Sequence, residues 1–278
     1  MGCTYVIVAY TSEPEKTALL LSQALDEVDR IDALMSHYKK ESALSRINRE
    51  AAFRSMVIDS ELFDFIERCL EYSRVSDGAF DITVGRLMKV WGFFDGNPRV
   101  PSAEALGDAV AQTGYKHVIL NKGERSIRFA RPGIELDTGG IGKGYAVDRA
   151  IAILKSRGVT RALVNAGGST IFAIGTPPSE IGWEIKIEGY APVRLRDRAL
   201  SVSGAYSKSF ESNGIRYGHI LDPRTGWPVQ GIDKVIVIAG SGTEADALDN
   251  VLFVIGPQAS REFLKQRGGA EAFFITRP

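Results

Sequence analysis

The periodicity of apolar residues changes about halfway along the chain, and this change limits the folds that the sequence can adopt. In the first half, apolar residues recur at three- and four-residue intervals, as on the buried face of an amphipathic helix. In the second half, short β-branched and aromatic runs alternate with turn residues, as in strands joined by hairpins. This partial segregation favours an α+β fold with mixed or antiparallel sheets and flanking helices over a doubly wound parallel sheet.

The individual elements follow from local signals. A strand is expected over residues 4–10, and Ser12 to Glu15 has the spacing of a capping box at the start of a helix that reaches Met35. The residues after Tyr38 are expected to form a loop. Further helices are expected over 61–74, 83–91, 103–112 with Ser102 as N-cap, 144–156, 244–254 and 259–266. Strands are expected over 118–120, 126–129, 162–165, 183–188, 200–203, 234–239 and 273–276, with a hairpin turn at Asn213-Gly214.

The 278 residues suit one large domain or two small ones. No Pro/Ser-rich linker and no internal repeat divides the sequence, so we expect one domain over residues 1–278, in which one interwoven chain builds two subdomains.

Lysines and arginines number 34, as do aspartates and glutamates, and no block of like charge predicts binding to nucleic acid. No apolar run is long enough to span a membrane and no export signal opens the sequence, so we expect a cytoplasmic protein. Cys3 and Cys69 are expected to be plain thiols.

His219 is the first candidate for chemistry. It precedes the turn Asp222-Pro223-Arg224-Thr225-Gly226. An imidazole titrates near physiological pH, so a histidine held beside a rigid turn is suited to exchange protons with a substrate. The alternative is that this histidine only caps a hairpin.

Two segments, one rich in side-chain oxygens and one rich in glycine, are candidates for a metal site and a phosphate site. Asp246, Asp249 and Asn250 fall at positions i, i+3 and i+4, which places three oxygen-bearing side chains on one face of a helix start and suits Mg²⁺. The same acids would also complement a helix dipole. Residues 137–144 form a glycine-dense turn in which Lys143 supplies positive charge, although the spacing matches neither a P-loop nor a dinucleotide fingerprint.

Other polar and aromatic residues have structural interpretations. His37 and His117 are predicted to be structural or to face solvent. A tight bend is the preferred interpretation of Gly167-Gly168. The aromatic residues Phe80, Trp91, Phe93 and Phe94 are able to stack on a flat ring, but aromatic residues after a helix stop more often belong to a core.

Taken in order, these segments resemble the FAD:protein FMN transferases, also called the ApbE or flavin transferase family, over nearly the whole chain. Eight ordered matches carry the resemblance. They are Met1 to Tyr5, Met35 to Tyr38 with Ser42 to Asn48, Gly78 to Val84 with Trp91-Gly92-Phe93, Asp137 to Asp148, Val164 to Gly168, Ser203-Gly204, His219 to Gly226 and Ala245-Asp246-Ala247.

The resemblance implies the α+β fold of that family and an Mg²⁺-dependent reaction. In that reaction FAD is cleaved at its pyrophosphate, FMN is joined by a phosphoester bond to a Thr or Ser hydroxyl of a target flavoprotein, and AMP leaves. It also implies residue roles. Met1, Tyr38, Ala79, Phe80, Asp81, Asp137, Lys143 and Ile220 would contact FAD; the Gly140 carbonyl, Asp246, Asp249 and Asn250 would hold Mg²⁺; His219 would be the general base.

The sequence departs from the family pattern at several positions. Cys3 and Asn250 stand where the family has Thr, Ser169 stands for a frequent Asp, and Gly218 stands for a frequent Ser. Many family members are periplasmic or lipid-anchored, which leaves a second compartment open beside the cytoplasm. Two alternative functions also remain open: hydrolysis of FAD to FMN and AMP, and binding of FAD without catalysis.

Overall fold

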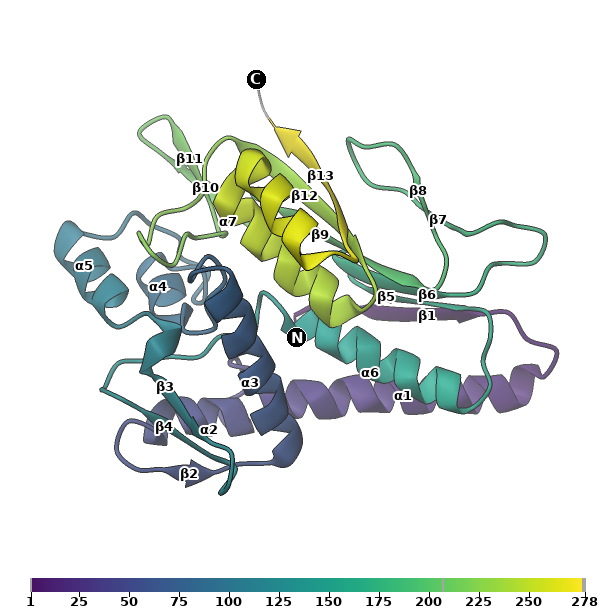
Figure 1. Cartoon of the computed structure of the whole chain (residues 1–278), viewed down its shortest axis with the longest axis horizontal. Helices are drawn as coiled ribbons and strands as arrows, with labels where there is room; N and C mark the ends of the chain where they lie inside the picture. Colours follow the sequence, from purple (N-terminus) through teal and green to yellow (C-terminus); the bar gives the residue numbers. More distant parts are fainter. Residues whose placement is uncertain (1, 207, 277–278) are drawn as a thin grey trace.

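In a computed structural model, which describes residues 2–206 and 208–276, the largest sheet is antiparallel and has six strands (Figure 1). The strand order is β1-β5-β6-β9-β12-β13, and each strand runs antiparallel to its neighbours. The strands are β1 (Tyr5–Ala9), β5 (Ala162–Ala166), β6 (Thr170–Ile174), β9 (Arg198–Gly204), β12 (Ile232–Ala239) and β13 (Glu271–Thr276). The prediction of an α+β fold with antiparallel pairing is confirmed.

Both faces of the sheet are covered. One face packs against the helices α1 (Pro14–Met35), α6 (Gly142–Ser156) and α7 (Gly242–Arg267). The opposite face packs against the short hairpin β7 (Trp183–Ile185) and β8 (Val193–Leu195). On β12, Val235 and Val237 belong to the helix-side core, while Ile236 and Ile238 belong to the hairpin-side core. This alternation is expected because successive side chains of a strand point to opposite faces.

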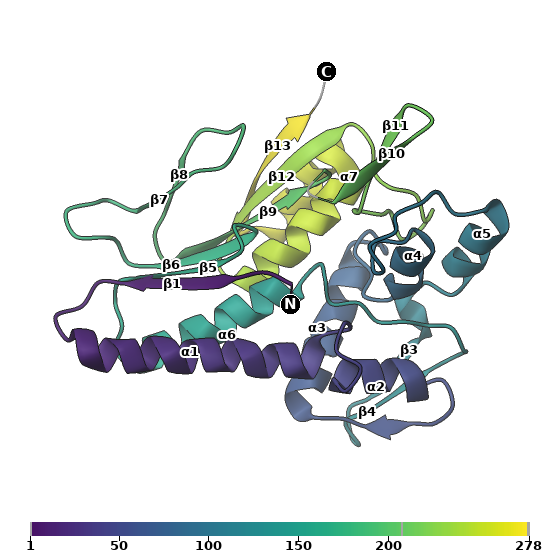
Figure 2. The same cartoon turned by 180° about the vertical axis from the view of Figure 1, so that it is seen from behind.

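The chain between α1 and α6 forms a second, mainly helical lobe, which lies beside the sheet in both views (Figures 1 and 2). Its helices are α2 (Ala43–Glu50), α3 (Ser60–Val75), α4 (Gly85–Val90) and α5 (Ala103–Ala111), followed by a 3₁₀ turn, Tyr115–His117. Its small sheet has the order β2-β4-β3, with β2 (Met56–Val57), β3 (Val118–Asn121) and β4 (Ser126–Phe129).

A hairpin from the second half of the chain reaches this lobe. Strands β10 (Ser209–Ser212) and β11 (Ile215–Gly218) carry Phe210 and Tyr217, whose rings lie 6.3 and 5.5 Å from the ring of Trp91. Trp91 also donates a hydrogen bond of 2.8 Å from Nε1 to the Gly226 carbonyl. The segment 219–226, directly after β11, is thereby held at the junction between the sheet and the helical lobe.

Several local predictions are confirmed. Ser102 caps α5 by accepting a hydrogen bond from the amide of Ala105. The two closing helices form one element, α7, whose backbone breaks at Gly256 with φ of 77°, and Pro257 follows. A glycine at positive φ followed by proline ends one helical run, as the sequence pattern predicted.

Other local predictions are wrong. Ser12 does not form a capping box: the N-cap of α1 is Glu13, which makes no side-chain capping bond, and Pro14 in the first turn leaves one amide fewer to cap. The expected loop after Tyr38 contains α2, whose N-cap is Ser42: its hydroxyl accepts a 3.0 Å hydrogen bond from the amide of Ser45. Strand β6 was also not predicted, because all five of its residues are buried and the polar alternation of a one-sided strand is missing.

In the described ranges, none of the helices combines the length and the apolar character that crossing a bilayer requires.

Candidate active site

A cleft of about 910 Å³ lies where the large sheet meets the helical lobe. The walls come from segments that are far apart in the sequence: 36–38, 79–81, 92–98, 137–143, 167–169, 202–204, 208–209 and 219–223. The predicted site residues that line it are Tyr38, Ala79, Phe80, Asp81, Asp137, Gly140, Lys143, His219, Ile220 and Asn250. Asp246 and Asp249 are buried beside Lys143 and Asn250, and Met1 lies outside the described residues.

The glycine-rich segment is held in the cleft by bonds to the helical lobe. Asn48 of α2 donates to the Leu136 carbonyl at 2.9 Å and accepts from the Leu136 amide at 2.8 Å. Thr138 donates from its hydroxyl to the Met35 carbonyl at the end of α1, at 3.1 Å. These bonds place Asp137 against the segment that follows α1, where it meets His37.

Helices α6 and α7 meet very closely at Gly144. A Cβ atom at this position would overlap the Gly242 carbonyl and would lie 2.8 Å from the Cβ of Asp246. The absence of a side chain allows the Gly144 amide to donate a 2.8 Å hydrogen bond to Asp246 Oδ2. Gly144 therefore serves close helix packing, which in turn brings the α7 acids to the glycine-rich segment.

The two α7 carboxylates form a buried pair. Asp246 and Asp249 have exposed fractions of 1% and 0%. Asp246 Oδ1 accepts from the Thr170 hydroxyl at 3.2 Å and lies 3.6 Å from Lys143 Nζ. Asp249 Oδ1 accepts from Asn250 Nδ2 at 2.7 Å, whereas Asp249 Oδ2 is buried and has no hydrogen-bond partner among the described residues.

The charges of this pair perturb one another. Burial and then the charge of Asp246 raise the pKa of Asp249 well above its ordinary value. Burial alone would lower the pKa of Lys143, but the charges of Asp246 and Asp249 outweigh it and raise that pKa. A cation placed against the pair would favour the ionised form of Asp249, which burial and Asp246 disfavour.

Two of the predicted metal ligands, the Gly140 carbonyl and Asp249, contact the side chain of a third, Asn250. Asn250 Nδ2 lies 3.2 Å from the Gly140 carbonyl oxygen and 2.7 Å from Asp249 Oδ1, so these two oxygens surround one position. In residues 2–206 and 208–276, no group of three or more His, Cys, Asp or Glu side chains is arranged to hold a metal. The two carboxylates would need the carbonyl and the amide oxygen to complete a ligand set, which is compatible with Mg²⁺ because this ion keeps several waters.

His219 lies directly after β11 and lines the cleft. Its Nδ1 is buried and has no hydrogen-bond partner among the residues described. Burial, together with the charges of Lys208 and Lys143, lowers the pKa of His219 to about 4. The imidazole is therefore neutral at physiological pH and is able to accept a proton. The turn that follows is fixed by Arg224, which donates from Nε to Asp222 Oδ1 at 2.9 Å.

Asp81 is occupied with its own loop. Its carboxylate accepts from the Thr83 amide and hydroxyl at 2.8 and 2.6 Å, and from the Tyr115 amide at 2.7 Å. Burial raises the pKa of Asp81, while these hydrogen bonds act in the opposite direction. Asp81 therefore holds the loop 79–81 in shape at the cleft wall.

Some wall residues had been assigned to structure by sequence reasoning. His37 was predicted to be structural or solvent-facing, but its ring lines the cleft and lies 2.9 Å from Asp137, measured between Nδ1 and Oδ1. Phe93 and Phe94, predicted as core, and Gly167-Gly168, predicted as a bend, also line the cleft. A signal was available for His37, because it directly precedes Tyr38 in the segment predicted to contact the ligand.

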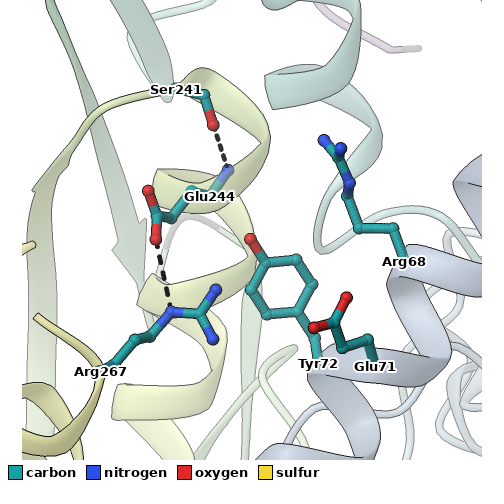
Figure 3. Close-up of a pocket in the computed structure, with 6 residues that line it drawn as sticks. All are labelled: Arg68, Glu71, Tyr72, Ser241, Glu244 and Arg267. Atoms are coloured by element: carbon teal, nitrogen blue, oxygen red, sulfur yellow. Dashed lines mark hydrogen bonds and ion pairs between the residues drawn. The ribbon is translucent and has the colours of Figure 1, made fainter. Parts of the chain in front are cut away.

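A second pocket, of about 240 Å³, lies between α3 and α7 (Figure 3). Two of its four charged side chains pair with each other: Arg267 Nε lies 3.3 Å from Glu244 Oε1, and the Arg267 guanidinium stacks on the ring of Tyr72. It shares no lining residue with the large cleft. The larger cleft is therefore the candidate active site.

Comparison with known proteins gives a family. The model of the ApbE family matches residues 1–274. A protein of Treponema pallidum named FAD:protein FMN transferase is 32% identical over 99% of this chain and 82% of its own length. A protein of the same name from Escherichia coli K12 is 31% identical over 95% of this chain and 79% of its own.

The structural comparison agrees. The Pseudomonas stutzeri flavinyl transferase ApbE, in its apo form, superposes with a TM-score of 0.88 and is 34% identical, covering 100% of this chain and 89% of that one. The ApbE protein of Thermotoga maritima gives a TM-score of 0.86 at 31% identity, over 99% and 91% of the two chains. Similarity of this extent covers both the sheet and the helical lobe, and the chain therefore belongs to the ApbE family.

Proposed function

We propose that this protein transfers FMN from FAD to a Thr or Ser hydroxyl of a target flavoprotein and releases AMP, with Mg²⁺ as cofactor. The observation that carries the proposal is the meeting of His219, Lys143 and the buried pair Asp246/Asp249 around one cleft. Such a cleft offers a proton acceptor, a phosphate-binding cation and a cation site together, which is the set that phosphoryl transfer needs. The names of the relatives support the same reaction.

The residues fit Mg²⁺. The Gly140 carbonyl, Asp246, Asp249 and Asn250 would hold it, and the unpartnered Asp249 Oδ2 and the mutual repulsion of the two acids are features that a bound cation removes. The Asn250 amide would have to turn so that Oδ1 rather than Nδ2 faces the Gly140 carbonyl and Asp249. When bound, Mg²⁺ would neutralise negative charge on the diphosphate and on departing AMP.

The protein groups around the cleft have distinct tasks in this proposal. Tyr38, Asp137 and the 79–81 loop would bind FAD together with Ile220 and Met1, and Lys143 would hold a phosphate oxygen. Neutral His219 would take the proton of the acceptor hydroxyl. The hydroxyl oxygen then forms a bond to the phosphorus of the FMN half, the bond from that phosphorus to the bridging oxygen breaks, and AMP leaves with the electron pair.

One experiment separates this reaction from its two rivals. The protein is incubated with FAD, Mg²⁺ and a candidate acceptor flavoprotein, and the products are measured by mass spectrometry of the acceptor and by chromatography of the nucleotides. An FMN adduct on Thr or Ser with an equal amount of AMP is expected. Free FMN with AMP and no adduct would replace transfer by hydrolysis, and unchanged FAD would replace it by storage. An acceptor with Val at the modified Thr, and a reaction with EDTA, are the matched controls.

A further inference from the structure

His37 and Asp137 form a dyad in the wall of the cleft. His37 follows the end of α1 by two residues, and Asp137 opens the glycine-rich segment before α6. The two side chains are 10% and 5% exposed, and Nδ1 lies 2.9 Å from Oδ1. The bond from Thr138 to the Met35 carbonyl ties the two segments together next to the dyad. The contact is therefore a fixed part of the cleft rather than a chance meeting of surface groups.

The dyad sets the orientation of the imidazole. Burial of Asp137 favours its neutral form, but His37, the Gly139 amide and Lys143 outweigh burial and keep the pKa of Asp137 below its ordinary value. Asp137 is thus a carboxylate, and His37 Nδ1 carries the proton that it donates to this carboxylate. The ring packs against Tyr38 and Phe94, whose ring centroids lie 3.9 and 4.4 Å away and which also contact each other.

This arrangement leaves the other ring nitrogen without a function inside the fold. His37 Nε2 is buried and has no hydrogen-bond partner among the described residues. Leaving a buried polar atom unpaired costs about 1–3 kcal/mol, and native proteins rarely do so. With Nδ1 donating to Asp137, Nε2 is a hydrogen-bond acceptor in the neutral ring and a donor in the imidazolium. A flat ring whose edge carries both an N–H group and an acceptor atom would satisfy Nε2 in either form.

We propose that His37 is a ligand-positioning residue whose Nε2 hydrogen-bonds the polar edge of a heteroaromatic ring of FAD, with Asp137 fixing the orientation of the imidazole. This inference rests on the proposed function. Both halves of FAD offer the required chemistry, since the flavin ring carries an N–H and the adenine ring an amino group.

Two substitutions separate this role from a purely structural one. His37→Asn keeps a polar group near the position of Nδ1, next to Asp137, but removes the group at Nε2. His37→Gln places an amide near the position of Nε2. Both lose the stacked ring, so a difference between them reports on the Nε2 hydrogen bond. His117→Gln, on a partly exposed histidine that does not line the cleft, is the control.

Binding of FAD, FMN and ADP is measured by fluorescence or calorimetric titration in EDTA, so that no transfer occurs, and the melting temperature of each ligand-free variant is recorded. We expect His37→Asn to weaken FAD binding about tenfold, the loss of one hydrogen bond, and His37→Gln to recover most of it. The loss should be shared by FMN if the flavin ring contacts His37, and by ADP if the adenine ring does. Equal FAD affinities of His37→Asn and the parent, or equal weakening in the Asn and Gln variants, would overturn the inference. A parent protein that binds no FAD would instead overturn the proposed function itself.

Discussion

Replacing Asp249 by Asn should stabilise the metal-free protein while abolishing its response to Mg²⁺. Asp249 is fully buried, one of its oxygens has no partner among the described residues, and Asp246 lies one helical turn away. Two like charges about 5.5 Å apart repel by about 3 kcal/mol at an effective dielectric constant of about 20. Lys143 offsets part of this repulsion, since its attraction acts against the rise in the pKa of Asp249. We therefore expect a gain of about 1–3 kcal/mol in the free energy of unfolding.

Substitution of the neighbouring Asp246 provides a control whose effect on the free energy of unfolding should have the opposite sign. Asp246 accepts hydrogen bonds from the Gly144 amide and the Thr170 hydroxyl, both of them buried groups. Asp246→Ala would leave these donors unpaired, so it should destabilise the protein by about 1–3 kcal/mol. Asp249→Asn removes the charge and retains one oxygen for the hydrogen bond from Asn250. Both variants remove a predicted metal ligand, so both should lose the Mg²⁺-dependent stabilisation and FMN transfer.

Calorimetry of the two variants and the parent, in EDTA and in excess Mg²⁺, tests this reasoning. For a chain of this size a change of 1 kcal/mol shifts the melting temperature by about 2 °C, so Asp249→Asn should melt about 2–6 °C higher than the parent in EDTA. The stability difference should shrink at acidic pH. The raised pKa of Asp249 means that its folded-state penalty is absent below the ordinary aspartate pKa and grows as pH rises towards the folded value. A lower melting temperature of Asp249→Asn in EDTA would refute the claim that the pair is repulsive.

Three further predictions concern His219 and Gly144. His219→Ala should lower the rate of FMN transfer by about 10²–10⁴-fold in single-turnover assays, with little change in FAD affinity in binding assays. His117→Ala should change neither quantity. Loss of FAD binding as the only defect of His219→Ala would contradict the role of His219 as base. Burial lowers the pKa of His219 to about 4, so the transfer rate should decrease at acidic pH near 4 rather than near 6.5. The stability that this histidine contributes should also decrease as pH falls from about 6.5 towards 4. A decrease in transfer rate centred at pH 6.5 would contradict a buried His219. Gly144→Ala should destabilise by about 1–3 kcal/mol, because its Cβ would overlap the Gly242 carbonyl, whereas Gly107→Ala, with open space around it in α5, should be neutral or stabilising in the same thermal melts.

Local signals predicted most of the secondary structure because they act over a few residues. The apolar spacing from Leu21 to Met35 and the cap at Ser102 are both readable without tertiary context, and both elements form as expected. Strand β6 was missed because burial on both faces removes the alternation that identifies a strand. Helix α2 was missed although Ser42 is a regular N-cap, because an eight-residue helix presents few periodic positions to read.

The candidate site was predicted as a set of segments, but their meeting depends on long-range contacts. Residue chemistry and spacing, together with motif resemblance, selected His219, Lys143 and the α7 acids, and the structure brings these groups around one cleft. The sequence gives no measure of the close packing at Gly144 that joins Lys143 to Asp246, because this packing depends on the approach of α7, about 100 residues further along the chain. The electrostatic consequences, such as the lowered pKa of His219, also follow from burial that local sequence does not specify.

His37 was misassigned for a physical reason that does not apply to the other site residues. An isolated histidine at the end of an amphipathic helix has two ordinary environments, solvent or core, and sequence offers no reason to prefer a third. What makes His37 a candidate ligand contact is the distant Asp137, which takes one ring nitrogen, and the two flanking rings, which hold the imidazole in the cleft wall. Asp137 in turn is placed by bonds from Asn48 and Thr138 to and from the backbone. The role proposed for His37 therefore depends on contacts spanning about 100 residues, and it is visible only once the cleft is assembled.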